Sequence, residues 1–150
     1  MVMFKPILIG IMLSGVIGTH PAPEVDLRNV NGITLYDDAG DIVRKQGKPA
    51  NVAKDPYLAE SEIYDYPDMR IGLRGGIVDF VEIPGGAASL TIDGETVPPS
   101  AQALRELLGE PDYKAEDGIV FQRKEALLKL FIDNETQTLE RIRYYHLASV

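Results

Sequence analysis

Cysteine is absent from the 150-residue chain, and histidine occurs only twice. Without cysteine the protein has no disulfide bond, no thiolate nucleophile, no cysteine-ligated zinc and no lipid-modified N-terminal cysteine. His20 falls within an apolar N-terminal segment, which leaves His146 as the one histidine of the remaining chain. A lone histidine near the end of a strand is typical of a surface position, because catalysis requires an oriented partner for the imidazole.

The sequence also contains no G-x-S-x-G, P-loop, G-x-G-x-x-G or H-E-x-x-H motif. The acidic run DDAGD at residues 37–41 departs from an EF-hand loop, since Ala39 stands where a ligand is needed, and it suits helix capping better. We therefore predict a protein that is not an enzyme, with no catalytic residue, no metal site and no cofactor. A carboxylate pair acting as general acid and base stays open, and with it the alternative of an extracytoplasmic hydrolase.

Positive charge is scarce. The chain has 15 lysines and arginines against 23 acidic residues, a formal net charge of −8, and it contains no basic run. Nucleic acids and anionic membranes are bound through clustered lysine and arginine, which displace counterions. The composition therefore argues against both as partners.

The longest apolar stretch lies at the N-terminus, in MVMFKPILIGIMLSGVIGTHPAP. One cation, an apolar stretch and a polar exit containing proline are typical of a secretory signal peptide, which we predict at residues 1–22. The stretch is short for a membrane span, which needs about 20 apolar residues. An uncleaved anchor formed by residues 4–18 is the alternative. Either prediction places the rest of the chain outside the cytoplasm.

Two parts of the chain resemble each other. Residues 31–55 align with residues 93–117 at a constant offset of 62, and seven positions are identical, where roughly one or two are expected from average residue usage. The identical pairs are Gly32/Gly94, Thr34/Thr96, Ala39/Ala101, Gly47/Gly109, Pro49/Pro111, Ala53/Ala115 and Asp55/Asp117. This pattern predicts tandem duplication, with repeats at residues 23–86 and 87–150.

Each repeat predicts the same elements. A tight turn at Asn31-Gly32 or Asp93-Gly94 precedes a helix, capped by Asp37 or Asp38 in the first repeat and by Ser100 in the second. Each helix ends at a G-x-P sequence, because glycine adopts the left-handed conformation and proline prevents continuation. Three strands follow: EIYDY, MRIGLR and GIVDFVEI in the first repeat, and GIVFQR, ALLKLFI and TLERIRYYH in the second. The predicted fold is α+β, with two tandem α-β-β-β repeats forming an antiparallel sheet and the helices packed on one face.

The helix-closing LLGEPD, the strand GIVFQR and the repeated α-βββ order resemble the tandem-repeat β-lactamase-inhibitor-protein-like fold, whose single-copy relatives are outer-membrane lipoproteins of the SmpA/OmlA type. The sequence lacks the lipid-bearing cysteine of those lipoproteins and the disulfide cysteines of the inhibitor. The resemblance implies a sheet face that binds protein, and it carries over no catalytic residue.

Aromatic and arginine residues in the predicted strands supply candidates for such a face. We predict a partner-binding surface on the helix-free side of the sheet, because tyrosine provides contact area at low entropic cost. Its residues are Tyr64, Tyr66, Arg70, Phe80, Arg141 and Tyr144. Core packing is the alternative role for the aromatic members. The expected function is that of a non-enzymatic, extracytoplasmic module that binds a protein or cell-envelope ligand, and an inhibitor is its most concrete form.

Overall fold

The computed structural model describes residues 25–149, so the predicted signal peptide at residues 1–22 lies outside the described residues. The described chain is an α+β protein of two short helices, ten strands and a C-terminal 3-10 turn. In chain order the elements are α1 (Ala39–Gln46), β1 (Asn51–Lys54), β2 (Ser61–Tyr66), β3 (Met69–Arg74), β4 (Ile77–Pro84), β5 (Leu90–Ile92), β6 (Glu95–Val97), α2 (Ala101–Leu108), β7 (Tyr113–Ala115), β8 (Gly118–Arg123), β9 (Ala126–Ile132), β10 (Leu139–His146) and η2 (Leu147–Ser149). No helix within residues 25–149 is long and apolar enough to cross a membrane.

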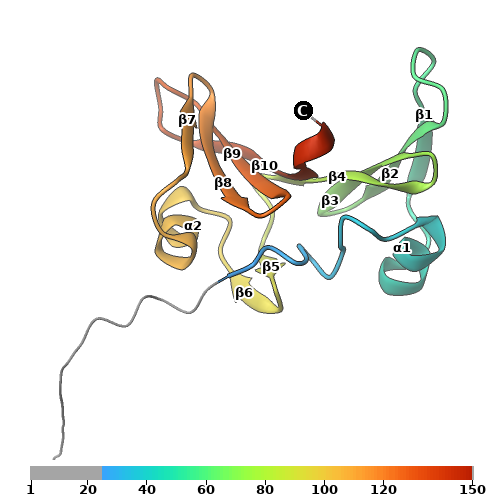
Figure 1. Ribbon diagram of the computed structural model, residues 1–150, viewed down its shortest axis with the longest axis horizontal. Helices are drawn as coiled ribbons and strands as arrows, with labels where there is room; N and C mark the ends of the chain where they lie inside the picture. Colours follow the sequence, from blue (N-terminus) through green and yellow to red (C-terminus); the bar gives the residue numbers. More distant parts are fainter. Residues whose placement is uncertain (1–24, 150) are drawn as a thin grey trace, which may run out of the picture.

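Eight strands form one antiparallel sheet in the order β1-β2-β3-β4-β10-β9-β8-β7, with the β4–β10 pair at its centre (Figure 1). β5 and β6 form a separate hairpin. The six strands expected from the sequence are all present, with bounds within one residue of those predicted. The expectation of three strands after each helix is wrong, because β1 and β7 add a fourth strand at each edge of the sheet. Both added strands are short and exposed throughout, so neither has the apolar alternation that marks a strand in sequence.

The predicted turns are confirmed. Asn31 and Gly32 have φ angles of 52° and 81°, and Asp93 and Gly94 have φ angles of 51° and 84°. Positive φ at both central residues is what a type I′ turn requires. The second turn joins β5 to β6, and the first is closed by a single bridge between Val30 and Ile33.

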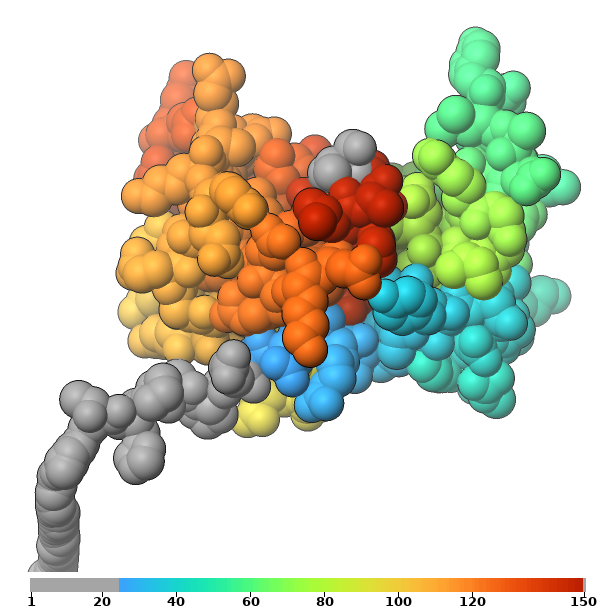
Figure 2. Space-filling view, viewed as in Figure 1, coloured from blue at the N-terminus to red at the C-terminus, as the bar shows by residue number. Residues whose placement is uncertain are grey.

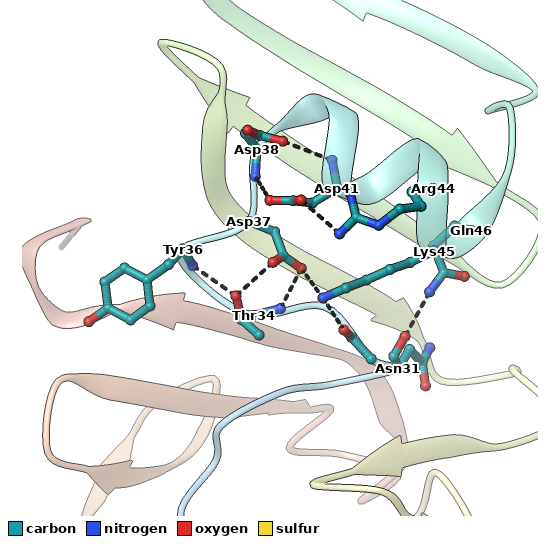
Figure 3. Close-up of polar contacts among 10 residues, drawn as sticks. Asn31, Thr34, Tyr36, Asp37, Asp38, Asp41, Arg44, Lys45 and Gln46 are labelled. Carbon is teal, nitrogen blue, oxygen red and sulfur yellow. Dashed lines mark hydrogen bonds and ion pairs between the residues drawn. The ribbon is translucent and has the colours of Figure 1, made fainter.

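The acidic run at residues 37–41 holds the start of α1 (Figure 3). Asp38 is the N-cap, and it exchanges hydrogen bonds with Asp41 in a capping box. Asp37 is buried and accepts hydrogen bonds from the backbone N–H and the hydroxyl of Thr34 and from Lys45 Nζ at 2.7 Å. These carboxylates therefore stabilise the helix and the turn before it.

Ser100 caps α2 as predicted, by accepting a hydrogen bond from the backbone N–H of Ala103. Both helices end at the glycine of the G-x-P sequence. Gly47 and Gly109 have φ angles of 86° and 88°, and each donates its N–H to the carbonyl four residues earlier. This confirms the glycines as helix terminators.

One face of the sheet carries the hydrophobic core. The two helices, the β5–β6 hairpin and an N-terminal strap, residues 25–35, lie on this side (Figure 1). Ile42 of α1 and Leu104 of α2 belong to the same buried cluster as Ile71 of β3 and Ile142 of β10. The opposite face carries no α-helix, and the sheet rises toward both outer edges (Figures 1 and 2). The C-terminal 3-10 turn η2 lies on this side, and its Ser149 hydroxyl donates to Asp79 Oδ1 of β4 at 3.0 Å (Figure 1). We call this side the helix-free face because no α-helix lies on it.

The strap joins the two halves of the molecule. The carboxylate of Asp93, at the tip of the β5–β6 hairpin, accepts hydrogen bonds from the backbone N–H groups of Asp26, Arg28 and Asn29. The hydroxyl of Tyr144 in β10 donates to the carbonyl of Leu27 at 2.6 Å. A segment that precedes the first helix is therefore bound mainly by residues of the second half.

Candidate functional site: the helix-free sheet face

The strands β4, β10 and β9 place a set of charged and aromatic side chains on the helix-free face. Residues that are directly opposite each other in an antiparallel pair share a face. The register aligns Arg143 with both Glu82 and Lys129, Tyr145 with Phe80, and Arg141 with Phe131. Their sequence neighbours Ile142 and Tyr144 point into the core. We call this set the sheet-face cluster: Phe80, Glu82, Lys129, Phe131, Arg141, Arg143 and Tyr145.

Glu82 is the acidic residue around which the arginines of the cluster are grouped, and its side chain is only 13% exposed. Arg143 donates to Glu82 Oε1 from Nη2 at 2.7 Å and from Nε at 3.2 Å. Arg141 Nε lies 3.6 Å from the same oxygen, and Arg70 Nη1 of β3 lies 3.9 Å from Oε2. One largely buried carboxylate therefore binds Arg143 directly and lies close to the guanidinium groups of Arg141 and Arg70 on the same face.

Two phenylalanine rings make cation–π contacts with the positively charged side chains of the cluster. The guanidinium carbon of Arg143 lies 4.4 Å from the Phe80 ring centre, and that of Arg141 lies 3.8 Å from the Phe131 ring centre. Lys129 Nζ lies 4.5 Å from the same Phe131 ring. Cation–π contacts of this kind fix the position of a charged group while leaving its hydrogen-bond donors available.

A glycine in β3 makes room for Phe80. A Cβ atom at Gly72 would lie 2.1 Å from the Phe80 ring, so the ring occupies the space that any side chain at Gly72 would need. Gly72 and Phe80 are paired across β3 and β4. Gly72, Phe80 and Arg143 thus form a stack that rises from the sheet.

A hollow of about 250 Å³ opens beside the stack. It is lined by Asp79, Phe80, Lys129, Phe131, Arg143, Tyr145 and Ser149. Pockets for small molecules and cofactors usually measure about 300–1,000 Å³, so this hollow has the size of a single large side chain.

The cluster itself contains three cations, Lys129, Arg141 and Arg143, and one anion, Glu82. Acidic neighbours offset part of this positive charge, because Asp117 Oδ1 lies 2.9 Å from Lys129 Nζ and Asp79 lines the hollow. Aromatic and arginine side chains are the residue types enriched where proteins bind one another.

The structure divides the six predicted site residues between the two faces. Arg70, Phe80 and Arg141 lie on the helix-free face. Tyr64 and Tyr66 are placed on the core side, because the register sets them opposite the buried Ile71 and Met69. The expectation that they lie on the helix-free face is therefore wrong. Tyr66 donates its hydroxyl to the Gly47 carbonyl at the end of α1 at 2.8 Å, and burial followed by the neighbouring Tyr64 raises the pKa of Tyr66.

The placement of Tyr144 is also a correction. Its side chain is in the core, 1% exposed, with its hydroxyl bound to Leu27, and burial raises its pKa above that of an ordinary tyrosine. In β10 the outward residues are Arg141, Arg143 and Tyr145. The alternation of β10 with Ile142 could have shown this, because Tyr144 shares its face with that apolar residue and Tyr145 with the arginines.

His146 lies in a different hollow, of about 660 Å³, between the strap and the β8–β9 turn. Its Nδ1 accepts a hydrogen bond from the backbone N–H of Ala148, its Nε2 lies 3.7 Å from Glu125 Oε1, and its ring meets that of Tyr36 edge-on. The imidazole is thus held at the end of a strand by backbone, carboxylate and aromatic contacts.

The carboxylates with shifted pKa values do not resemble general acids. The pKa of Asp117 is lowered, chiefly by its hydrogen bond with Lys129, and the pKa values of Asp41 and Asp133 are lowered by backbone N–H donors. A general acid at neutral pH needs a raised pKa. Residues 25–149 also contain no group of three or more side chains placed to hold a metal ion.

Fold and site together define a class: an α+β protein with a continuous antiparallel sheet, one face buried under helices and the other lined by arginine and aromatic residues. No family model matches the sequence, and no curated protein does. Solved structures to which the chain is similar include the following three.

The first is an extracellular protein containing a SCP domain from Bacillus anthracis, with a TM-score of 0.54 and 10% identity over 88% of this chain and 48% of that one. The second is a cysteine-rich secretory protein from Staphylococcus aureus, with a TM-score of 0.50 and 10% identity over 82% of this chain and 48% of that one. A DUF4309 family protein from Bacillus subtilis has a TM-score of 0.49 and 16% identity over 77% of this chain and 82% of that one. The chain spans about half the length of the first two proteins, and at 10% identity they show the fold alone.

Proposed function

We propose that the protein is a non-enzymatic, extracytoplasmic binding module that recognises a partner protein through the sheet-face cluster. The observation that supports this most directly is the group of arginines held over phenylalanine rings around Glu82, on a face that no α-helix covers. Such a surface combines rigid aromatic area with charged donors, and both features are common at binding hot spots.

The proposed location is supported by the apolar start of the sequence and by the two neighbours described as an extracellular protein and a secretory protein. An inhibitor, as the resemblance to the β-lactamase-inhibitor-like fold implies, is one form of this function. The hydrolase alternative gains no support, because the carboxylates with shifted pKa values have lowered values.

We further propose that the fold arose by tandem duplication, with repeats at residues 23–86 and 87–150. The strand order supports this, since β1-β2-β3-β4 and β7-β8-β9-β10 are arranged alike on the two sides of the central β4–β10 pair. The equivalent turns at Asn31 and Asp93 and the equivalent glycine terminators support it further.

The absence of cysteine allows a direct test of the proposed face. A single cysteine introduced as Tyr145→Cys can be coupled to a polyethylene glycol maleimide, which then covers the cluster. The matched control is Gln102→Cys on the exposed side of α2. Both conjugates, and the unlabelled proteins, are used to capture proteins from the cell-envelope fraction of the source organism.

We expect the conjugate at position 145 to lose partners that the wild-type chain and the position-102 conjugate retain. Equal capture by the two conjugates, with folding verified by circular dichroism, would show that partners bind elsewhere.

A further inference from the structure

Within residues 25–149, Arg141 differs from Arg143 and Arg70 in making no hydrogen bond with its guanidinium group. Arg143 is fixed by two hydrogen bonds to Glu82, and Arg70 donates to Asp65 from Nε at 3.0 Å. Arg141 approaches Glu82 only to 3.6 Å, which is beyond an ordinary N–H···O hydrogen bond. Its side chain is 42% exposed, so its donors are accessible from the helix-free face.

Phe131 holds this guanidinium in place. The two groups are 3.8 Å apart, and Phe131 itself is buried beneath Arg141 and Lys129. A guanidinium stacked on a ring keeps its N–H donors at its edges, where they match the two oxygens of a carboxylate. Because the stacked side chain is already ordered, binding an anion there loses less side-chain entropy.

The spacing along β10 suits an extended peptide. Arg141, Arg143 and Tyr145 are successive outward residues, about 6.6–6.8 Å apart in a strand. A peptide in an extended conformation has the same spacing between alternate side chains. A group bound at Arg141 would therefore place the side chain two residues further along near the hollow beside Phe80 and Tyr145.

We infer that the partner presents an extended acidic segment, with an Asp or Glu carboxylate on Arg141 and an apolar or aromatic side chain, two residues away, in the 250 Å³ hollow. This inference rests on the proposed function and specifies the chemistry of the partner protein. The exposed guanidinium donors of Arg141, which make no hydrogen bond to Glu82, favour an acidic ligand. The hollow is lined by three aromatic residues and by the polar Asp79, Lys129, Arg143 and Ser149. Its rings favour a peptide over a phosphate polymer, which has no apolar group to place against them, and the Asp79 carboxylate would repel a phosphate.

The probe is a fluorescein-labelled nonapeptide in which Glu, Phe and Glu occupy alternate positions and Ser the rest. Two control peptides replace both Glu residues with Lys or replace Phe with Ser. Fluorescence anisotropy gives the affinity, and amide chemical-shift changes locate the binding strands. The variants are Arg141→Gln, Arg141→Glu and, as a control with the same charge reversal, Arg28→Glu in the strap, whose side chain is 76% exposed.

We expect shift changes confined to β4, β9 and β10, at least tenfold weaker binding of the Lys peptide, and weaker binding of the Ser peptide. Arg141→Glu should weaken binding at least tenfold, Arg141→Gln by less, and Arg28→Glu by under twofold. Equal binding of the Glu and Lys peptides, or equal loss in Arg28→Glu, would overturn the inference. Tighter binding of inorganic polyphosphate than of the peptide would identify a phosphate ligand and overturn it as well.

The two proposals fail separately. If the position-145 conjugate no longer captures the partner protein but the acidic peptide does not bind, the helix-free face is the binding site and the inference of an acidic partner segment is wrong. If the conjugate has no effect, the proposed function fails whatever the peptide does.

Discussion

Tyr144 shows how a single residue contributes to the fold through its polar atom. Its hydroxyl reaches the Leu27 carbonyl across 117 residues of sequence, in a position that is closed to water. We expect Tyr144→Phe to lower the free energy of unfolding by about 1–3 kcal/mol, because the Leu27 carbonyl loses its buried partner. Tyr144→Ala should lower it by about 3–5 kcal/mol through loss of core volume. Urea denaturation measures both, and a change under 0.5 kcal/mol in Tyr144→Phe would contradict the buried role.

The same residue predicts a dependence of stability on alkaline pH. Burial first, and then nearby Asp93, raises the pKa of Tyr144 in the folded state above its value of about 10 in the unfolded chain. The neutral hydroxyl therefore stabilises the fold fully below pH about 10, and this contribution is lost as the pH rises further. Between pH 9 and pH about 11, the stability of Tyr144→Phe should fall less than that of the wild type. Parallel slopes for the two proteins would show that Tyr144 is not responsible.

Residue identity alone did not reveal which aromatic side chains face outward. Tyr144 and Tyr145 are adjacent and chemically identical, and a shift of one residue in a strand exchanges the faces. Within β10 the deciding information is the alternation with Ile142, which shares the buried face with Tyr144. Which residues the outward ones meet depends on the register of β10 against β4, which joins residues about 60 apart in sequence. Arg141 and Phe80 could be placed from local alternation, whereas Tyr64 and Tyr66 needed the pairing of β2 with β3.

At the scale of elements, the β3–β4 pair depends on the missing side chain of Gly72. A methyl group there would lie 2.1 Å from the Phe80 ring. We expect Gly72→Ala to destabilise the protein by about 1–3 kcal/mol, as overpacking does. In Phe80→Ala the space is free, so adding Gly72→Ala should then have a smaller effect, and the two changes should not be additive.

Gly86→Ala is the matched control for this cycle, because a Cβ atom there would meet no atom within 4 Å. We expect Gly86→Ala to change the midpoint temperature of thermal unfolding only slightly. Additive effects of Gly72→Ala and Phe80→Ala would show that the ring does not occupy the glycine's space.

The turn between β9 and β10 predicts a loss of stability in acid. The Asp133 carboxylate accepts hydrogen bonds from the backbone N–H groups of Thr136 and Glu135, and these lower its pKa in the folded state. A lowered folded pKa means that the stabilisation is present above pH about 4 and is lost as the pH falls. The unfolding free energy of Asp133→Asn, measured between pH 7 and pH 3, should therefore fall less steeply than that of the wild type. If the unfolding free energies of the two proteins fall equally steeply with pH, the Asp133 turn does not contribute to the loss of stability in acid.

Elements with local signals were predictable, and elements without them were not. Glycine terminators, capping side chains and alternating apolar residues gave both helices and six strands. The edge strands β1 and β7 have no buried face, so only their hydrogen bonds to β2 and β8 define them. The strap is held by Asp93 and Tyr144, which no local pattern connects with residues 25–35.

The whole molecule should fold as one unit. The two halves share the central β4–β10 pair, and the strap of the first half is bound by the second. Each half alone has about 60 residues, a size at which burial is marginal without disulfides. We expect residues 23–86 and 87–150, expressed separately, to lack dispersed amide spectra and cooperative thermal transitions.

A mixture of the two fragments should recover part of the native spectrum, since the β4–β10 pairing and the strap contacts are then available. Two fragments that each unfold cooperatively on their own would contradict a shared core.

The pairing of β4 with β10 also sets the order in which the protein can mature during synthesis. In a chain that emerges from its N-terminus, the segment of β4 is made well before β10, so one edge of β4 and the carbonyl of Leu27 wait for the last strand. Until β10 arrives, β4 exposes unpaired backbone groups that another chain could occupy. We therefore expect a pause in translation or export before residue 139 to increase aggregation of the nascent protein, and rapid synthesis of β10 to reduce it.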